Sequence, residues 1–339
     1  MKAEIFTTNL NFKYPFVLAS GTRTSTPVLF LRVSFNGKTG WAEAALPPYF
    51  GLTSNDVVEK LQTVSLANMF SHFTNATELN EKIRKTYTLP EPVNALLVSA
   101  AVNLTENYVV GQGNYQSTLT VSASPGIAMR DLLAEQENFT AIKIKVGSGD
   151  EQGFIEYVLK STDKPFCIDA NRGWKNRDKA ALFCEWLEKK KCLLLEQPFE
   201  ASDLESHHWL RSRTSIPVIA DESICTYTDL LSSYDAFDGV NIKLLKCGGP
   251  VEAKKMMGFS KEKKLKTLIG CMSESSLGCA TAARLSHLVD FVDLDGPYLI
   301  NNDPFSGFLM RNGRIEINEN GILPTETFLS AFSARAVTL

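Results

Sequence analysis

Residues 165–223 read PFCIDANRGWKNRDKAALFCEWLEKKKCLLLEQPFEASDLESHHWLRSRTSIPVIADES, a stretch that repeats one pattern three times. Each repeat contains a short apolar run that ends in one carboxylate, first Asp169, then Glu196 and then Asp221. The acids recur about every 25 residues, which is the length of a βα unit. In a parallel barrel the carboxyl ends of the strands meet at one rim, so we expect the three carboxylates to lie together there.

The same alternation of apolar run and amphipathic segment continues on both sides of this stretch. We expect eight strands, at residues 118–123, 141–147, 165–171, 192–198, 217–223, 239–245, 266–272 and 291–297. The segments between them carry apolar residues at helical spacing. Eight such units predict an α/β fold, a modified (β/α)8 barrel with its active site at the carboxyl ends of the strands. No glycine-rich dinucleotide fingerprint follows a strand.

The first part of the chain follows a different pattern. Residues 28–44 alternate as two strands joined by Asn36–Gly37, which is a strong hairpin signal, and helical segments follow at 54–70 and 91–109. This combination predicts an N-terminal α+β capping domain. The expected division is a capping domain at residues 1–115, a barrel at 116–310 and a tail at 311–339 that returns to the capping domain.

Composition narrows the class of protein. A net charge of −3, from 35 basic and 38 acidic residues, gives no reason to expect binding to nucleic acid or to a membrane. No apolar run approaches the roughly 20 residues that span a bilayer, and no secretory signal is recognisable. The seven cysteines include no CxxC pair. We therefore expect reduced thiols in a cytoplasmic protein rather than disulfides or a zinc site.

The three strand-end acids predict a metal site. A single acid at a strand end is commonly a helix cap or a surface charge. Three unpaired carboxylates brought together repel one another, and a divalent cation removes that cost. Carboxylates are also the ligands that Mg²⁺ prefers. We therefore expect Asp169, Glu196 and Asp221 to bind Mg²⁺.

Lysines stand on the strands on either side of these acids. Lys143 and Lys145 are two residues apart in one strand and share a face. Two neighbouring ammonium groups disfavour each other's charged form, which predicts Lys145 as a base and Lys143 as a partner for a substrate oxygen. Lys243, on the sixth strand, faces Lys145, on the second, across the barrel. We expect these two bases to remove and return a proton on opposite faces of one carbon, and Lys246 to be exposed to solvent.

Taken together, these motifs resemble the enolase superfamily, in its muconate-lactonising-enzyme-like subgroup. The resemblance extends over nearly the whole chain and rests on the KIK of Lys143–Lys145, the three acids, NIKLLKCGG at 241–249 and GCMSESSLG at 270–278. It implies an enolase-type barrel in which proton transfer passes through an enediolate stabilised by Mg²⁺. Branches of the family that use a histidine near the seventh strand are disfavoured, because none of the four histidines lies at an expected strand end.

Within the subgroup, the last strand is the most informative. Asp293 and Asp295 in FVDLDGP (291–297) share one face, although a helix cap or a turn is the alternative. Two acids away from the metal favour a cationic group on the substrate. The pair resembles that of the dipeptide epimerases, where it holds the α-ammonium of the N-terminal residue. The resemblance therefore implies epimerisation of the C-terminal residue of an Ala-Xaa dipeptide.

The resemblance also implies contacts around this dipeptide. Cys271 and Ser273 are expected to contact its backbone, and Thr118 and Thr120 are expected to reach its carboxylate. Packing is the alternative for each. The family further implies that barrels of this type associate, so a homo-oligomer is an open expectation.

Two loops of the capping domain are expected to read the side chain of Xaa, at residues 20–27 and 46–56. Arg23 in the first loop predicts an acidic Xaa. Tyr49 and Phe50 in the second predict a small or apolar one. The sequence leaves both open.

Other functions fit part of the pattern. An o-succinylbenzoate synthase or an N-acylamino acid racemase would use the same lysines and metal but would not need Asp293 and Asp295. A Schiff-base aldolase would use Lys145 or Lys243 without three metal carboxylates. A non-catalytic ligand-binding protein would exchange no substrate proton with solvent.

Overall fold

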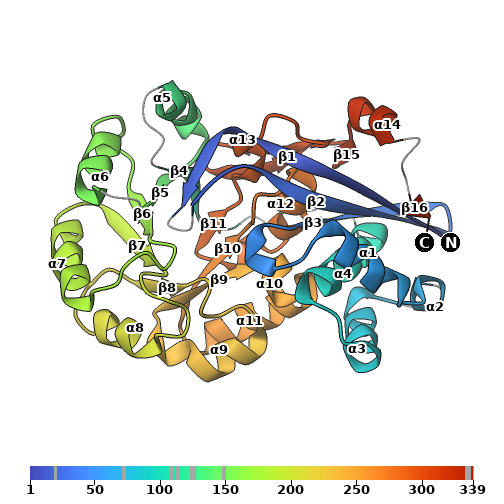
Figure 1. Cartoon of the computed structure of the whole chain (residues 1–339), viewed down its shortest axis with the longest axis horizontal. Helices are drawn as coiled ribbons and strands as arrows, with labels where there is room; N and C mark the ends of the chain where they lie inside the picture. Colours follow the sequence, from blue (N-terminus) through green and yellow to red (C-terminus); the bar gives the residue numbers. More distant parts are fainter. Residues whose placement is uncertain are drawn as a thin grey trace.

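The computed structural model describes residues 1–18, 21–70, 74–106, 110, 113, 115–122, 127–146, 150–332 and 337–338. Figure 1 shows a barrel ringed by helices and, beside it, an antiparallel sheet with helices packed against it, with both chain ends at the sheet. Within these residues no helix is both long and apolar enough to cross a membrane.

The barrel is closed and parallel. Its eight strands pair in the order β10-β11-β4-β5-β6-β7-β8-β9. They are β4 (Gln116–Val121), β5 (Ala141–Lys145), β6 (Phe166–Asp169), β7 (Cys192–Glu196), β8 (Val218–Ala220), β9 (Gly239–Lys243), β10 (Lys266–Gly270) and β11 (Phe291–Asp293). All eight coincide with expected strands, because each is an apolar run buried on both faces, as strands of a helix-covered parallel barrel are. The predicted fold class is confirmed.

Helices connect these strands and cover the outside of the barrel. The principal ones are α5 (Ile127–Ala134), α6 (Glu151–Leu159), α7 (Arg177–Glu188), α8 (Leu204–Arg211), α9 (Tyr227–Ser233), α11 (Pro250–Glu262) and α12 (Ser276–Ala283). Short turns of helix supplement them at α10 (Leu244–Cys247), α13 (Gly296–Leu299), η2 (Gln136–Asn138), η3 (Tyr234–Ala236) and η4 (Ser286–Leu288). Asp, Asn, Thr or Ser side chains cap the N-termini of α6 to α9 and α12.

The cap is a sheet of order β16-β1-β2-β3 with helices on one face. Its strands are β1 (Lys2–Leu18), β2 (Gly21–Phe35), β3 (Lys38–Ala45) and β16 (Val337–Thr338). The helices are η1 (Pro48–Phe50), α1 (Ser54–Gln62), α2 (Leu66–Phe70), α3 (Ala76–Thr86) and α4 (Glu91–Thr105). The expected Asn36–Gly37 turn joins β2 to β3, with φ of 50° and 76°, as a tight two-residue hairpin requires.

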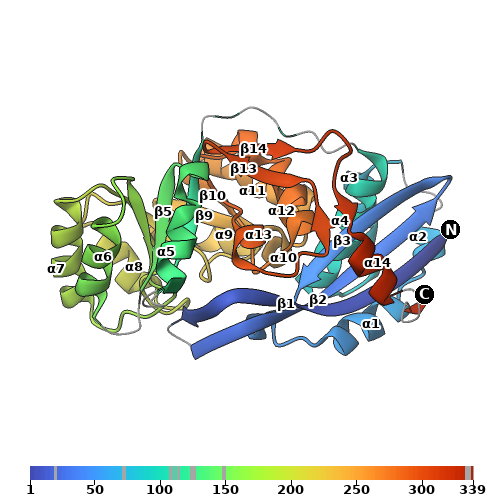
Figure 2. The same ribbon diagram turned by 90° about the horizontal axis from the view of Figure 1, so that it is seen from above.

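The last part of the chain follows β11 with two small antiparallel pairs and a helix. These elements are β12 (Phe305–Ser306), β13 (Phe308–Arg311), β14 (Arg314–Ile317), β15 (Leu323–Pro324) and α14 (Glu326–Phe332). Five aromatic rings join β1, β2 and β3 to β12 and α14, with centroids 5.1 to 6.1 Å apart, namely Phe6, Phe30, Trp41, Phe305 and Phe328. Figure 2 shows that β1 and β2 also run from the cap along the barrel towards β5 and α5.

Candidate active site

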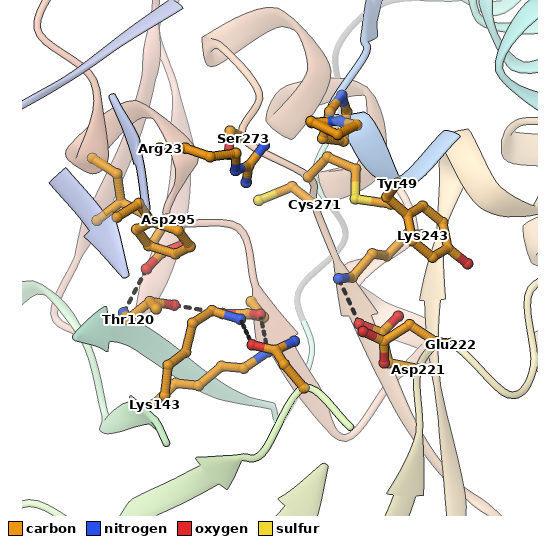
Figure 3. A pocket seen from close by; sticks show the side chains of 18 of the residues that line it. Arg23, Tyr49, Thr120, Lys143, Asp221, Glu222, Lys243, Cys271, Ser273 and Asp295 are labelled. Carbon is orange, nitrogen blue, oxygen red and sulfur yellow. Dashed lines mark hydrogen bonds and ion pairs between the residues drawn. The ribbon is translucent and has the colours of Figure 1, made fainter. Parts of the chain in front are cut away.

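A cavity of about 440 Å³ opens where the barrel strands end and the cap covers them. Ten of the thirteen predicted site residues line it (Figure 3). They are Arg23, Thr120, Lys143, Lys145, Asp221, Lys243, Cys271, Ser273, Asp293 and Asp295. The other three, Thr118, Asp169 and Glu196, do not line the cavity, and at most 1% of each residue is exposed.

Strand register brings the acids and the lysines to one level. Lys145 pairs with Asp169, and Asp169 pairs with Glu196, at the last residues of β5, β6 and β7. Asp221 follows the last residue of β8 directly, and all three acids are buried. The carboxylates predicted to converge therefore do stand on adjacent strands at one rim.

Lys143 lies at the centre of this charge cluster. Its Nζ is 2.7 Å from Asp293 Oδ2, 2.9 Å from Glu196 Oε2 and 3.2 Å from Asp169 Oδ2. Burial by itself would lower the pKa of Lys143, but these carboxylates outweigh it and hold the pKa well above its ordinary value. Lys143 is therefore a fixed cation.

The two predicted bases stand on opposite sides of the barrel. Lys145 Nζ donates to Asp169 Oδ2 at 2.7 Å and to Asn171 Oδ1 at 2.9 Å. Lys243 Nζ donates to Asp221 Oδ2 at 2.9 Å, and a Cβ at Gly270 would come within 3.1 Å of Lys243 Cε. Their strands, β5 and β9, are four places apart in the ring of eight, and both side chains line the same cavity.

The buried acids Asp169 and Glu196 differ in how their surroundings shift their pKa values. Burial opposes ionisation of Asp169, but Lys145 and Lys143 reverse that effect and lower its pKa to about 2. Burial, with Asp169 and Asp221 nearby, raises the pKa of Glu196 to about 7 even though Lys143 lowers it. Asp169, Glu196 and Asp221 offer three oxygen ligands, and the lysines near Glu196 do not offset the cost of ionising it. A divalent cation would offset that cost, so this set of ligands suits one. In the described part of the chain, no three His, Cys, Asp or Glu side chains converge on one point; the ammonium groups of Lys143 and Lys246 lie against Glu196 and Asp221, and a bound divalent cation would supply positive charge to the same oxygens.

The expectation that Lys246 is exposed is wrong. The short helix α10 turns its side chain back under the rim, where it is only 3% exposed. Its Nζ donates to the Asp221 carbonyl oxygen at 2.6 Å, to Asp221 Oδ1, and to the Asn241 carbonyl oxygen at 3.2 Å. Burial would raise the pKa of Asp221, but Lys243 and Lys246 hold it well below its ordinary value.

Asp293 and Asp295 differ in their partners. Asp293 is occupied by Lys143 and accepts from Thr118 Oγ1 at 2.8 Å. Asp295 accepts from the Thr120 amide at 2.5 Å and makes no ion pair with any described residue. Burial and the neighbouring Asp293 raise the pKa of Asp295 to about 7. A bound cation would remove this unfavourable environment. The Thr118 hydroxyl donates to Asp293 and does not line the cavity.

The cap contributes Arg23 and Tyr49 to the cavity wall. The expectation of a loop at residues 20–27 is wrong for residues 21–27, which belong to strand β2 because they pair with the end of β1, and Ser20 lies outside the described residues. Arg23 is half-buried, and Figure 3 shows it entering from the side away from Lys143. Tyr49 Oη lies 3.0 Å from Cys225 Sγ. Phe50 does not line the cavity but packs against the apolar core of the cap, so it cannot form the pocket wall expected of it.

Asn171, Arg172 and Glu222 also line the cavity, although their roles were not anticipated. Asn171 and Arg172 follow Asp169 with positive φ of 42° and 64°, a conformation uncommon for side chains of this size. This turn sets the Asn171 amide against Lys145 and places Arg172 Nε 3.5 Å from Glu222 Oε1. The residues ANRG after the first acid signalled a turn, but not its direction.

This fold and the arrangement at its rim define an enolase-type barrel. The family described as "Enolase C-terminal domain-like" matches residues 128–314, so the chain belongs to that family. The predicted membership of the enolase superfamily is confirmed.

Similar proteins indicate the class of reaction more narrowly than the family does. The L-Ala-D/L-Glu epimerase of Bacteroides thetaiotaomicron is 32% identical over 94% of this chain and 86% of that protein. The hydrophobic dipeptide epimerase of the Flavobacteria bacterium strain MS024-2A is 30% identical over 92% of this chain and 94% of that protein. A dipeptide epimerase structure from Cytophaga hutchinsonii, in complex with Mg and the dipeptide D-Ala-L-Val, superposes with a TM-score of 0.83 at 21% identity, over 100% and 98% of the two chains. These relatives confirm the prediction that the chain is an isomerase of the epimerase type.

Proposed function

We propose that this protein is a Mg²⁺-dependent dipeptide epimerase that inverts the α-carbon of the C-terminal residue in Ala-Xaa dipeptides. The observation that carries the proposal is the placement of Lys145 and Lys243 on opposite sides of one cavity, with acids at the rim between them. Two relatives that align with more than 90% of this chain support it; one is named as an L-Ala-D/L-Glu epimerase and the other as a hydrophobic dipeptide epimerase.

The two lysines divide the proton transfer. Burial opposes the charged form of Lys243, but Asp221 outweighs it and raises the pKa of Lys243, so this lysine enters the cycle as an acid. Lys145, held by Asp169 and Asn171, removes the α-proton from the other face. Removal on one face and return on the other inverts the carbon, and the reverse reaction exchanges the two roles.

Asp169, Glu196 and Asp221 would hold the Mg²⁺. When bound, Mg²⁺ supplies positive charge at the substrate carboxylate, which makes the adjacent carbon more acidic. Lys143 adds a fixed cation at the floor of the same cavity and stabilises the enediolate oxygen that develops when the proton leaves.

The α-ammonium of the first residue is assigned to Asp295, with Asp293 behind it. Asp295 is the acid of this pair that has no described cationic partner, and it lines the cavity. An ammonium placed there neutralises a buried carboxylate, which predicts a preference for free dipeptides over N-acylated amino acids.

Arg23 favours an acidic Xaa. Among the described residues, Arg23 makes one polar contact, with Thr26 Oγ1 at 3.4 Å, a long distance for a guanidinium hydrogen bond, and no described carboxylate pairs with it. Burial lowers the pKa of Arg23, so a carboxylate on the substrate would offset the cost of holding this charge in the cavity.

Deuterium exchange tests the proposal. We would incubate the protein with Mg²⁺ in D₂O and pools of L-Ala-L-Xaa dipeptides and follow mass and stereochemistry. A one-dalton gain with inversion at the second residue is expected, with Ala-Glu and Ala-Asp in the leading group. If no dipeptide exchanges but N-succinylamino acids do, the protein is an N-acylamino acid racemase that uses the same two lysines, and the dipeptide proposal is wrong.

Three assignments accompany this function as proposals. The capping domain, barrel and tail divide near residues 115 and 310. The protein acts in the cytoplasm, a compartment that suits its seven free cysteines. It also associates as a homo-oligomer, which gel filtration with light scattering would test.

A further inference from the structure

Glu43 joins the cap to the barrel at a point close to the substrate cavity. It lies on β3 and is 5% exposed, with its carboxylate directed at the start of α12. Its Oε1 accepts from the Ser275 amide at 2.9 Å, and its Oε2 accepts from the Gly278 amide at 3.0 Å and from the Ser275 hydroxyl. One cap residue thus holds three donors of the barrel.

The segment held in this way faces the substrate. Cys271, Met272 and Ser273 line the cavity, and the next two residues turn the chain into α12. Glu274 closes that turn by accepting from the Met272 amide at 2.7 Å through its Oε1. Because Ser275 is the N-cap of α12, a shift of Ser275 moves the cavity wall just before it.

The two carboxylates approach each other at Gly278. A Cβ on Gly278 would collide with Glu274 Oε2 and would lie 3.1 Å from Glu43 Oε2, so glycine leaves the space in which they meet. Neither acid makes an ion pair with a described Lys or Arg side chain. The charged or titratable neighbours of Glu43 are Glu274, Asp303 and Cys279, and those of Glu274 are Glu43, Lys243, Cys271 and Cys279.

We propose that Glu43 is a positioning residue for the substrate-facing loop Cys271–Ser275, which it holds from the capping domain while sharing one proton with Glu274. The role of the loop in binding substrate rests on the proposed function. The position of the loop does not, since it follows from the hydrogen bonds of Glu43.

Proton sharing follows from burial and proximity. Burial, and then repulsion by Glu274, raises the pKa of Glu43 to about 8, and burial raises the pKa of Glu274 to about 7. Both folded values exceed the unfolded value, so this pair's contribution to stability is greatest below the unfolded pKa and decreases as pH rises towards 8. Above that pH both acids are charged, and their repulsion opposes the contact between Glu43 and the loop.

Three variants test the proposal in the full-length protein. Glu43→Ala removes the carboxylate that accepts hydrogen bonds from Ser275 and Gly278. Glu274→Gln keeps an acceptor for the Met272 amide and puts a neutral donor where the shared proton lies. Glu59→Ala, an exposed change on α1, is the control. We expect Glu43→Ala to raise KM at least tenfold with a smaller loss in kcat. We expect the KM of Glu274→Gln to be the same at pH 7 and above pH 8, whereas the KM of wild type rises above pH 8.

Hydrogen exchange of the peptide covering residues 271–279 provides a readout that needs no activity. After correction for intrinsic rates, uptake should increase in Glu43→Ala at pH 7 and in wild type above pH 8, but not in Glu274→Gln or Glu59→Ala. Wild-type protection in Glu43→Ala, or identical pH profiles for wild type and Glu274→Gln, would overturn the proposal. If no dipeptide is turned over but the exchange pattern is as expected, the positioning role stands and the proposed substrate fails.

Discussion

The barrel rim and the cap residues Arg23 and Tyr49 face the same cavity but are held differently. At the rim, Lys143 is buried and has three carboxylates within 3.2 Å, and Lys246 is fixed by three acceptors. On the cap side, Arg23 is half-buried with one hydrogen bond of 3.4 Å, and Tyr49 is 43% exposed.

We infer from this difference that the rim carries out the proton transfer and that the cap selects the side chain of the substrate. Charges held by several partners on strand ends need little reorganisation when charge develops on the substrate. Side chains with few partners, such as Arg23 on β2 and Tyr49 in η1, adapt to different substrate side chains, and they can be exchanged without disturbing the barrel. Changes at the rim should therefore abolish turnover, whereas changes in the cap should redirect it.

The largest effect should come from removing one base at the rim. We expect Lys145→Met and Lys243→Met each to lower epimerisation by about 10³-fold or more, within the range for loss of a positioned acid or base. Each variant should still exchange solvent deuterium into one stereoisomer of the dipeptide, and the two variants should favour opposite stereoisomers. Lys261→Met, an exposed change on α11, is the control. Two-sided exchange in either variant would contradict the assignment of one base to each face.

The next largest effect should follow loss of a rim carboxylate. Asp221→Asn leaves Lys243 and Lys246 without their charged partner and should destabilise the protein by about 3–5 kcal/mol. It should also abolish the stabilisation that Mg²⁺ gives wild type, about 2.7 kcal/mol at a hundredfold excess over Kd. Thermal unfolding with and without Mg²⁺ measures both. If Mg²⁺ still stabilises Asp221→Asn as it does wild type, Asp221 is not a ligand.

A smaller effect is expected where the rim meets the first residue of the dipeptide. Asp295→Asn should raise KM for Ala-Xaa by about 10- to 100-fold with little change in kcat, because a buried charge pair is lost. Activity on an N-acylated amino acid, if detectable, should not fall. Asp178→Asn, exposed on α7, is the control. Equal losses on free and acylated substrates would remove Asp295 from ammonium recognition.

Sequence reasoning was successful where local pattern and topology agree. The eight strands were predictable because buried parallel strands are continuous apolar runs, and register then placed Lys145, Asp169 and Glu196 at one level. The three acids and both candidate bases therefore stood where a barrel requires them.

It failed where a short turn or a distant contact decides orientation. Lys246 looked exposed because nothing in its local pattern shows that α10 turns back under the rim. The long strand β1 was not anticipated, because its pairing with β2 and its contact with the barrel depend on residues far away in the chain. The hydrogen bond between Glu43 and Ser275 joins residues 232 positions apart, and no local pattern reveals such a contact.

The smallest effect on overall turnover should come from the cap, because it is limited to substrates with an acidic Xaa. Arg23→Met removes a charge with no described carboxylate partner, so neither folding nor the rim depends on it. We expect the melting temperature and the kcat on apolar Ala-Xaa to stay near wild type, while kcat/KM for Ala-Glu falls about 10- to 100-fold, as for the loss of one charged contact. The quantity to measure is the ratio of kcat/KM for Ala-Glu and Ala-Leu, with exposed Arg130→Met as control. An unchanged ratio would mean that Arg23 does not read Xaa, and a parallel loss on both substrates would mean that the cap and the rim are not separable.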